Sequence, residues 1–214
     1  ERLVGSEMCI RDRNNICVIP NPIITQTERF STCSAHQVIA AGRYVPQKGF
    51  DLLIEAWSII SKKYPTWTLR IYGDGVLRDS FQQRIDELAM TDSCILEHTV
   101  SNIVDKYCES SIFVLSSRFE GFGMVITEAM ACGVPPVSFD CPCGPKDIID
   151  DGKDGLLVEN ENIEKLAEKI AYLIENENIR MDMGRQARIN AQRFQMENIV
   201  KQWKRLFEEL SANS

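Results

Sequence analysis

From Gln37 onward, short apolar runs alternate with amphipathic segments. The first apolar run is Val38 to Ala41, and the segment Phe50 to Lys62 then repeats apolar residues at helical spacing. This pattern predicts a strand, a loop and a helix. The same alternation predicts strands at Leu69 to Tyr72, Cys94 to Leu96 and Ile112 to Ser116, each followed by a helix, at Leu77 to Ala89, at Asn102 to Glu109 and from near Gly123.

Two further strands, Pro136 to Phe139 and Leu156 to Val158, follow the chain breakers Gly133-Val134-Pro135 and Asp154-Gly155. The chain therefore has about six predicted strands. Strands that are short, continuously apolar and separated by helices are typical of a parallel sheet that is covered on both faces. Right-handed crossovers then favour an α/β fold with a doubly wound, mainly parallel sheet, which binds ligands beyond the carboxyl ends of its strands.

After Asn162 the pattern predicts helices only, at Ile163 to Glu175, Arg180 to Arg193 and Glu197 to Leu210. The last of these carries an apolar stripe of Trp203, Leu206 and Phe207. At the other end, Glu1 to Arg13 fit no element, and Gly5 to Arg13 resembles a translated sequencing adapter. We therefore interpret residues 1–15 as a non-native-looking or linker segment and residues 16–195 as one domain.

Composition and charge exclude several classes of protein. The 214 residues are 44% apolar and 26% charged, as in ordinary globular domains. The net charge of −7 has the wrong sign for binding nucleic acid. No apolar run approaches the roughly 20 residues of a membrane helix, and the first residues show no secretion signal. The eight cysteines form no pair of CxxC motifs, so we expect reduced thiols, no metal site and a cytoplasmic location.

Glycine-containing loops follow the first two predicted strands. In the segment Gly42 to Gly49, Arg43 offers a planar fork and Lys48 a mobile ammonium, which together could neutralise a diphosphate without a metal. A solvated loop with two surface cations is the alternative. Gly73 and Gly75 follow the second strand, but Arg78 stands where a dinucleotide-binding fingerprint needs glycine, so a tight turn without a ligand is also open.

The strongest local pattern follows the fourth strand. Glu120 lies in the predicted loop and Glu128 about one turn into the next helix, while Gly121 and Gly123 expose the backbone. Free amide groups near Gly123 to Val125 suit phosphate oxygens, and a carboxylate can accept two hydrogen bonds from a vicinal diol of a ribose or hexose. The alternative makes Glu120 a capping residue and Glu128 a surface residue of the helix.

Together these segments resemble a known family. Gly42-Arg43 with Lys48-Gly49, then Gly73-Asp74-Gly75, then the run from Glu120 to Pro135 are similar, in order and spacing, to the carboxyl-terminal donor-binding domain of retaining GT-B glycosyltransferases of the glycosyl transferases group 1 family. Glu120 and Glu128 have the spacing of the family's EX7E motif. The resemblance covers about Cys17 to Leu210 and implies a Rossmann-like fold.

The resemblance also implies roles for single residues. Arg43 and Lys48 would hold the diphosphate of the sugar donor and stabilise charge as the diphosphate leaves. Glu120 would contact the transferred sugar, and Glu128 would bind the ribose hydroxyls. The implied catalytic residues are Arg43, Lys48 and Glu120. The family generally needs no metal, so we expect no cofactor beyond a nucleotide sugar, most simply a UDP-sugar. The implied donor-binding residues are Gly42, Arg43, Lys48, Gly73, Val100, Glu120, Gly121, Phe122, Gly123, Met124, Val125 and Glu128.

Three places depart from the family or have no assigned role. Relatives usually carry glycine in the loop that here reads Glu97 to Ser101, beside the expected nucleobase site, and His98 is expected to be a loop or base-edge residue rather than a catalytic base. Cys141 and Cys143 are expected to shape a turn with Pro142 and Gly144. Arg118, a neighbour of Glu120, is expected to form a local ion pair.

The chain shows no counterpart of the family's acceptor-binding half, so we expect a fragment that is inactive in transfer by itself. Residues 196–214 are expected to form a helix that crosses to that half, with packing on the chain's own sheet as the alternative. The implied acceptor is a saccharide or lipid-linked glycan, and any association with the inner face of the membrane would need the missing half. A non-catalytic sugar-nucleotide-binding module and a GT-B-like epimerase are the alternative functions.

Overall fold

A six-stranded, wholly parallel sheet forms the centre of the protein in the computed structural model, which describes residues 17–24 and 27–212. The predicted fold class is confirmed. The proposed adapter-like segment lies outside the described residues. The strands are β1 (Gln37–Ala41), β2 (Thr68–Tyr72), β3 (Cys94–Glu97), β4 (Ile112–Leu115), β5 (Pro136–Phe139) and β6 (Leu156–Val158).

The order of the strands creates a reversal at the centre of the sheet. The order is β3-β2-β1-β4-β5-β6, so the chain moves outward from β1 in one direction and then returns to build β4 on its other side. Val38 of β1 is opposite Leu69 of β2 and Ile112 of β4. The crevice beyond the carboxyl ends of β1 and β4 is the place where open α/β sheets bind ligands.

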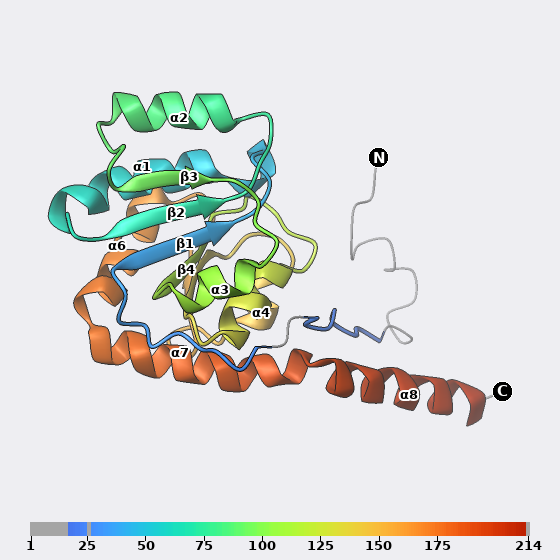
Figure 1. The fold of residues 1–214 in the computed structure, drawn as a ribbon. Helices are drawn as coiled ribbons and strands as arrows, with labels where there is room; N and C mark the ends of the chain where they lie inside the picture. The colour runs from blue at the N-terminus through green and yellow to red at the C-terminus, as the bar shows by residue number, and fades with distance from the viewer. Residues whose placement is uncertain (1–16, 25–26, 213–214) are drawn as a thin grey trace.

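Helices cover both faces of this sheet, and each face has its own apolar core (Figure 1). One core is built around Trp57 and Leu69, and the other around Phe113 and Ile126. Because the strands contact helices on both faces, all four residues of β4 and of β5 are buried. The first face carries α1 (Phe50–Lys63), α2 (Arg78–Glu87) and α6 (Ile163–Glu175), and the second carries α3 (Ile103–Cys108), α4 (Met124–Ala131) and α7 (Glu177–Ala191).

The structure differs from the predicted elements mainly at polar helix ends. Helix α7 begins at Glu177, three residues before the predicted start at Arg180, because its first turn is polar and gives no apolar periodicity. A four-residue helix, α5 (Pro145–Ile148), was not predicted, and neither were the 3₁₀ turns η3 (Pro46–Lys48) and η4 (Gln192–Phe194). Such short turns carry too few residues for a periodic signal.

The last helix, α8 (Met196–Ala212), extends away from the sheet (Figure 1). Ile199 is its buried residue, whereas Trp203 and Phe207 are 44% and 59% exposed and stack on each other with ring centroids 5.8 Å apart. The alternative that this stripe packs on the chain's own sheet is therefore wrong. Among the described residues, no helix has the length and apolar character needed to span a membrane.

Candidate functional site

The loops that follow β1 and β4 pack directly on each other in the central crevice. The Ser116 hydroxyl donates to the Lys48 carbonyl at 3.0 Å, and the Arg118 amide donates to the Gln47 carbonyl at 2.9 Å. Gly49, at φ 60°, directly precedes α1 at this contact, and a Cβ there would lie 2.0 Å from the Ser116 carbonyl oxygen. Glycine is therefore required for the close approach of the two loops.

A buried ion pair joins the two loops. Lys48 Nζ lies 2.7 Å from Glu120 Oε1, and the two side chains are 15% and 8% exposed. The Ser117 hydroxyl donates to the same oxygen at 2.6 Å. Glu120 Oε2 has no hydrogen-bond partner among the described residues. The structure thus brings two of the three sequence-predicted catalytic residues together, and Ser117 supports the pair although the sequence analysis did not select it.

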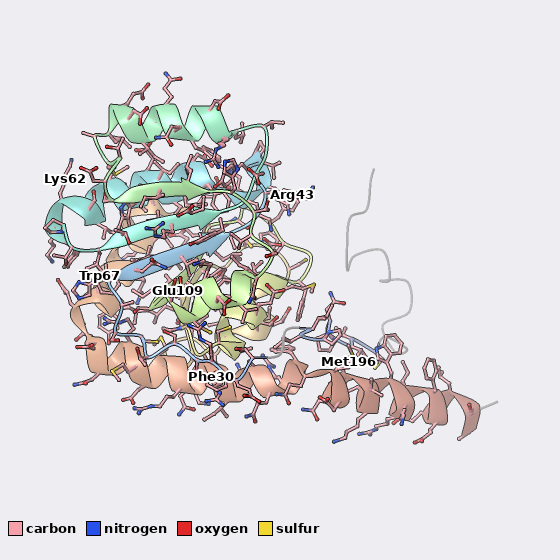
Figure 2. All side chains as sticks on the ribbon, in the orientation of Figure 1. Phe30, Arg43, Lys62, Trp67, Glu109 and Met196 are labelled. Carbon is pink, nitrogen blue, oxygen red and sulfur yellow. The ribbon has the colours of Figure 1, made fainter. Side chains whose placement is uncertain are left out.

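Arg43, the third predicted catalytic residue, is exposed in the loop that follows β1. Figure 2 shows it at the end of the sheet toward which the strand arrows of Figure 1 point. Within the described part of the chain, its guanidinium makes no ion pair or hydrogen bond. An exposed, unpaired guanidinium can bind an anion through its planar fork of N–H groups.

Helix α4 begins at the end of the loop that follows β4. Gly123, at φ 95°, precedes the helix, and no side chain caps it. The backbone N–H groups of Met124 and Val125 have no partner in residues 17–24 and 27–212. Unpaired amides and the positive end of the helix dipole attract phosphate or carboxylate oxygens. Gly121 has open space around it, since a Cβ there would meet nothing within 4 Å, while Phe122 packs against Phe194.

Glu128 lies on α4 as predicted, but it is half-buried rather than a surface residue. Burial raises the pKa of this carboxyl above its ordinary value of 4.5, and the Tyr107 hydroxyl opposes that shift. No cation of the described residues pairs with it. A half-buried carboxylate without a cation is destabilising for the fold, which favours a role in binding over a role in stability.

The loops after β2 and β3 are fixed to each other by Asp74. Its carboxylate accepts hydrogen bonds from the Thr99 amide at 2.9 Å and the Thr99 hydroxyl at 2.5 Å, and lies 2.6 Å from His98 Nδ1. The Thr99 hydrogen bonds, and then His98, lower the pKa of Asp74. His98 is therefore a loop residue that orients Asp74. Val100, in the same loop, is 40% exposed and belongs to the edge of the sheet, two strands from β1.

A close backbone contact fixes Gly73, the predicted site residue at the end of β2. A Cβ there would lie 1.9 Å from the carbonyl oxygen of Gly42, and the Gly42 amide donates to the Tyr72 carbonyl at 2.9 Å. Both glycines therefore support the loop that carries Arg43. Contact with a ligand is not needed to explain either glycine.

Arg118 forms ion pairs with Asp51 on α1 and, at 3.5 Å, with Glu161, but not with its sequence neighbour Glu120. The guanidinium donates to both Asp51 oxygens, at 2.9 and 2.6 Å. Burial raises the pKa of Asp51, but these hydrogen bonds outweigh it and the net pKa is lowered. The expectation of a local pair was wrong because the loop after β4 folds onto the start of α1. Arg118 thus stabilises the contact between the two loops.

The turn predicted around Cys141 and Cys143 is present and holds Glu120 in place. The Glu120 amide donates to the Pro142 carbonyl at 3.2 Å, and Cys143 and Gly144 adopt positive φ of 63° and 109°. Burial, followed by the charge of Glu120, raises the pKa of the Cys141 thiol to about 11. In the described residues, no three His, Cys, Asp or Glu side chains gather as metal ligands would.

The fold defines the class of the protein as a Rossmann-like α/β domain with a reversal of strand order at its centre. Within that class, the chain belongs to the family described as Glycosyl transferases group 1, whose sequence profile matches residues 33–190. The resemblance inferred from the motifs is confirmed.

Known relatives agree with this assignment. An uncharacterized glycosyltransferase of Haemophilus influenzae is 31% identical over 192 residues, which are 89% of this chain and 54% of the relative. The poly(ribitol-phosphate) alpha-N-acetylglucosaminyltransferase of Staphylococcus aureus is 34% identical over 166 residues, or 77% of this chain and 34% of the relative. The chain thus spans about half or less of the length of these relatives.

Solved structures show the same architecture. A variant of S. aureus TarM, in complex with Fondaparinux, alpha-GlcNAc-glycerol and UDP, has a TM-score of 0.82 at 33% identity, covering 90% of this chain and 39% of TarM. Anabaena Alr3699/HepE in complex with UDP and glucose has a TM-score of 0.73 at 26% identity, covering 85% of this chain and 49% of HepE.

Gly144 tests whether the cysteine turn holds the Glu120 loop. A Cβ at Gly144 would lie 2.0 Å from the Phe122 carbonyl oxygen, so Gly144→Ala is expected to lower the free energy of unfolding by more than about 2 kcal/mol in urea denaturation. Gly152→Ala is the matched control, since Gly152 has φ 78° but open space, and should cost only about 1 kcal/mol. Equal losses for the two variants would contradict the close contact.

Proposed function

We propose that this chain is the sugar-donor-binding half of a retaining glycosyltransferase. The full protein would move a hexosyl group from a nucleotide sugar, most simply a UDP-sugar, to a saccharide or lipid-linked acceptor in polysaccharide or glycan biosynthesis. The observation that carries this proposal is the ion pair of Lys48 and Glu120, which joins the loop after β1, where Arg43 lies, to the loop that leads into the uncapped start of α4. The UDP bound to TarM and HepE supports the choice of nucleotide.

Charge development explains why cations are needed in this crevice. When the bond between sugar and diphosphate breaks, negative charge grows on the leaving diphosphate oxygen. Arg43 and the amides at the start of α4 would bind the phosphates, and Lys48 would stabilise the leaving charge with an N–H not used by Glu120. Because these groups supply the positive charge, the proposed reaction needs no metal ion.

The two glutamates would recognise the sugar portions of the ligand. Glu120 keeps its Oε2 free of hydrogen bonds within the described residues, so this oxygen can accept from a hydroxyl of the transferred sugar while Oε1 holds Lys48 and Ser117. Glu128, one turn into α4, would accept from the two ribose hydroxyls. Val100 would lie beside the base, at the edge of the sheet.

The exposed stripe of α8 would serve the contact with the other half of the enzyme. Trp203 and Phe207 present an apolar surface away from the chain's own sheet, and covering it would remove apolar area from water. The proposed acceptor site would be completed by that half, so this chain alone should bind the nucleotide sugar without transferring it. We also propose that the domain works in the cytoplasm, where nucleotide sugars are available.

Glu128→Gln tests the proposed ribose contact. The substitution removes the charge that strengthens two hydrogen bonds, so the affinity for UDP should fall by about ten- to a hundredfold, measured by calorimetric titration in the presence of a chelator. Thermal stability should stay equal or rise, because a half-buried unpaired charge is removed. Glu164→Gln, at an exposed position of α6, is the matched control. Unchanged UDP affinity of Glu128→Gln would refute the assignment.

Glu120→Gln separates recognition of the sugar from recognition of the nucleotide. The variant weakens an acceptor for the sugar hydroxyl but leaves the phosphate and ribose contacts in place. The affinity for a UDP-sugar should therefore fall more than the affinity for UDP, when both are titrated under the same conditions. An equal loss for the two ligands would mean that Glu120 acts only by holding Lys48.

A further inference from the structure

Tyr107 carries a buried hydroxyl that no fold contact explains. The residue lies on α3, is 0% exposed, and packs its ring at 84° against Phe113, with ring centroids 5.8 Å apart. Its hydroxyl makes no hydrogen bond of regular geometry to any described residue. A buried hydroxyl without a partner is destabilising, and phenylalanine would fill the same space without that cost.

The hydroxyl faces the residue proposed to bind ribose. Helix α3 packs against α4, and the Glu128 carboxylate is the charged group that acts most strongly on the Tyr107 hydroxyl, followed by the Cys132 thiol at the end of α4. In turn, the Tyr107 hydroxyl opposes the effect of burial on the pKa of Glu128, and the Cys132 thiol also interacts with this carboxylate. No charged side chain of α5, α7, β4 or β5 shifts the pKa of Tyr107 or of Glu128.

We propose that Tyr107 is a positioning residue for nucleotide binding: its hydroxyl donates a hydrogen bond to the ionised Glu128 carboxylate while that carboxylate accepts the two ribose hydroxyls. This inference rests on the proposed function of Glu128. A carboxylate has about four lone-pair sites on two oxygens, so a diol on the crevice side and one phenol on the protein side can be accepted together. The hydrogen bond would fix the carboxylate's orientation and keep it charged.

The pH dependence of binding follows from this arrangement. Burial raises the pKa of Glu128 and the Tyr107 hydroxyl lowers it, so removing the hydroxyl should raise it further. Only the ionised carboxylate accepts both ribose hydroxyls. UDP affinity should therefore fall on acidification, and in Tyr107→Phe this loss should begin at a higher pH than in the parent chain.

The test is a double-mutant cycle of UDP affinity, titrated by calorimetry across a pH series with the parent chain, Tyr107→Phe, Glu128→Gln and the double variant. Tyr107→Phe should weaken UDP binding about tenfold at neutral pH and move the acidic loss of affinity upward. In the Glu128→Gln background the same substitution should change UDP affinity and its pH dependence little. Thermal unfolding should show that Tyr107→Phe folds as stably as the parent.

Tyr72→Phe is the control for loss of a hydroxyl from a buried tyrosine of the same core. Tyr72 lies in the same apolar core, at 6% exposure, and its charged neighbours are Glu97, Lys106, Arg70 and Glu109 rather than Glu128. The Tyr72→Phe variant should leave the pH dependence of UDP affinity unchanged. The inference is overturned if Tyr107→Phe keeps the full UDP affinity of the parent chain. It is also overturned if Tyr107→Phe lowers UDP affinity by the same factor in the Glu128→Gln background as in the parent chain. Full affinity in Glu128→Gln alone overturns the proposed function itself.

Discussion

The site depends on the packing of the loop after β1 against the loop after β4. These strands are neighbours in space but lie more than 70 residues apart in the chain, and their connections leave toward opposite faces of the sheet. The two loops must therefore meet across the crevice without a covering helix. Their contact is made by backbone hydrogen bonds, the glycine at position 49 and the ion pair between Lys48 and Glu120.

A buried ion pair at this place has a cost that a purely structural contact would avoid. Two charges are removed from water, and replacing such pairs by apolar residues is often neutral or stabilising. Arg118 and Asp51, which join the same two segments nearby, already supply a fully hydrogen-bonded bridge. The cost of the pair of Lys48 and Glu120 therefore supports the roles in donor binding that we propose for these two residues.

The sequence predicted the fold well, because the fold depends on periodicity, whereas the site at the strand ends stays a prediction. All six strands were located to within about a residue, and the glutamate spacing identified α4 and its loop. The partners of single side chains were not predictable. Arg118 binds Asp51 only because two segments that are distant in the sequence meet in the fold. Asp74 likewise joins two loops through Thr99. Nothing in the sequence pattern distinguishes Tyr107, with its unpartnered hydroxyl, from any other buried aromatic residue.

Hydrogen–deuterium exchange of this chain with and without UDP, in the presence of a chelator, tests the central claim most directly. The account predicts slower amide exchange in residues 42–49 and in residues 117–131, where the two loops and the start of α4 line the crevice, with no change in the surface groove between α1 and α6. Protection confined to that groove, or no protection at saturating UDP, would contradict a nucleotide site at the strand reversal.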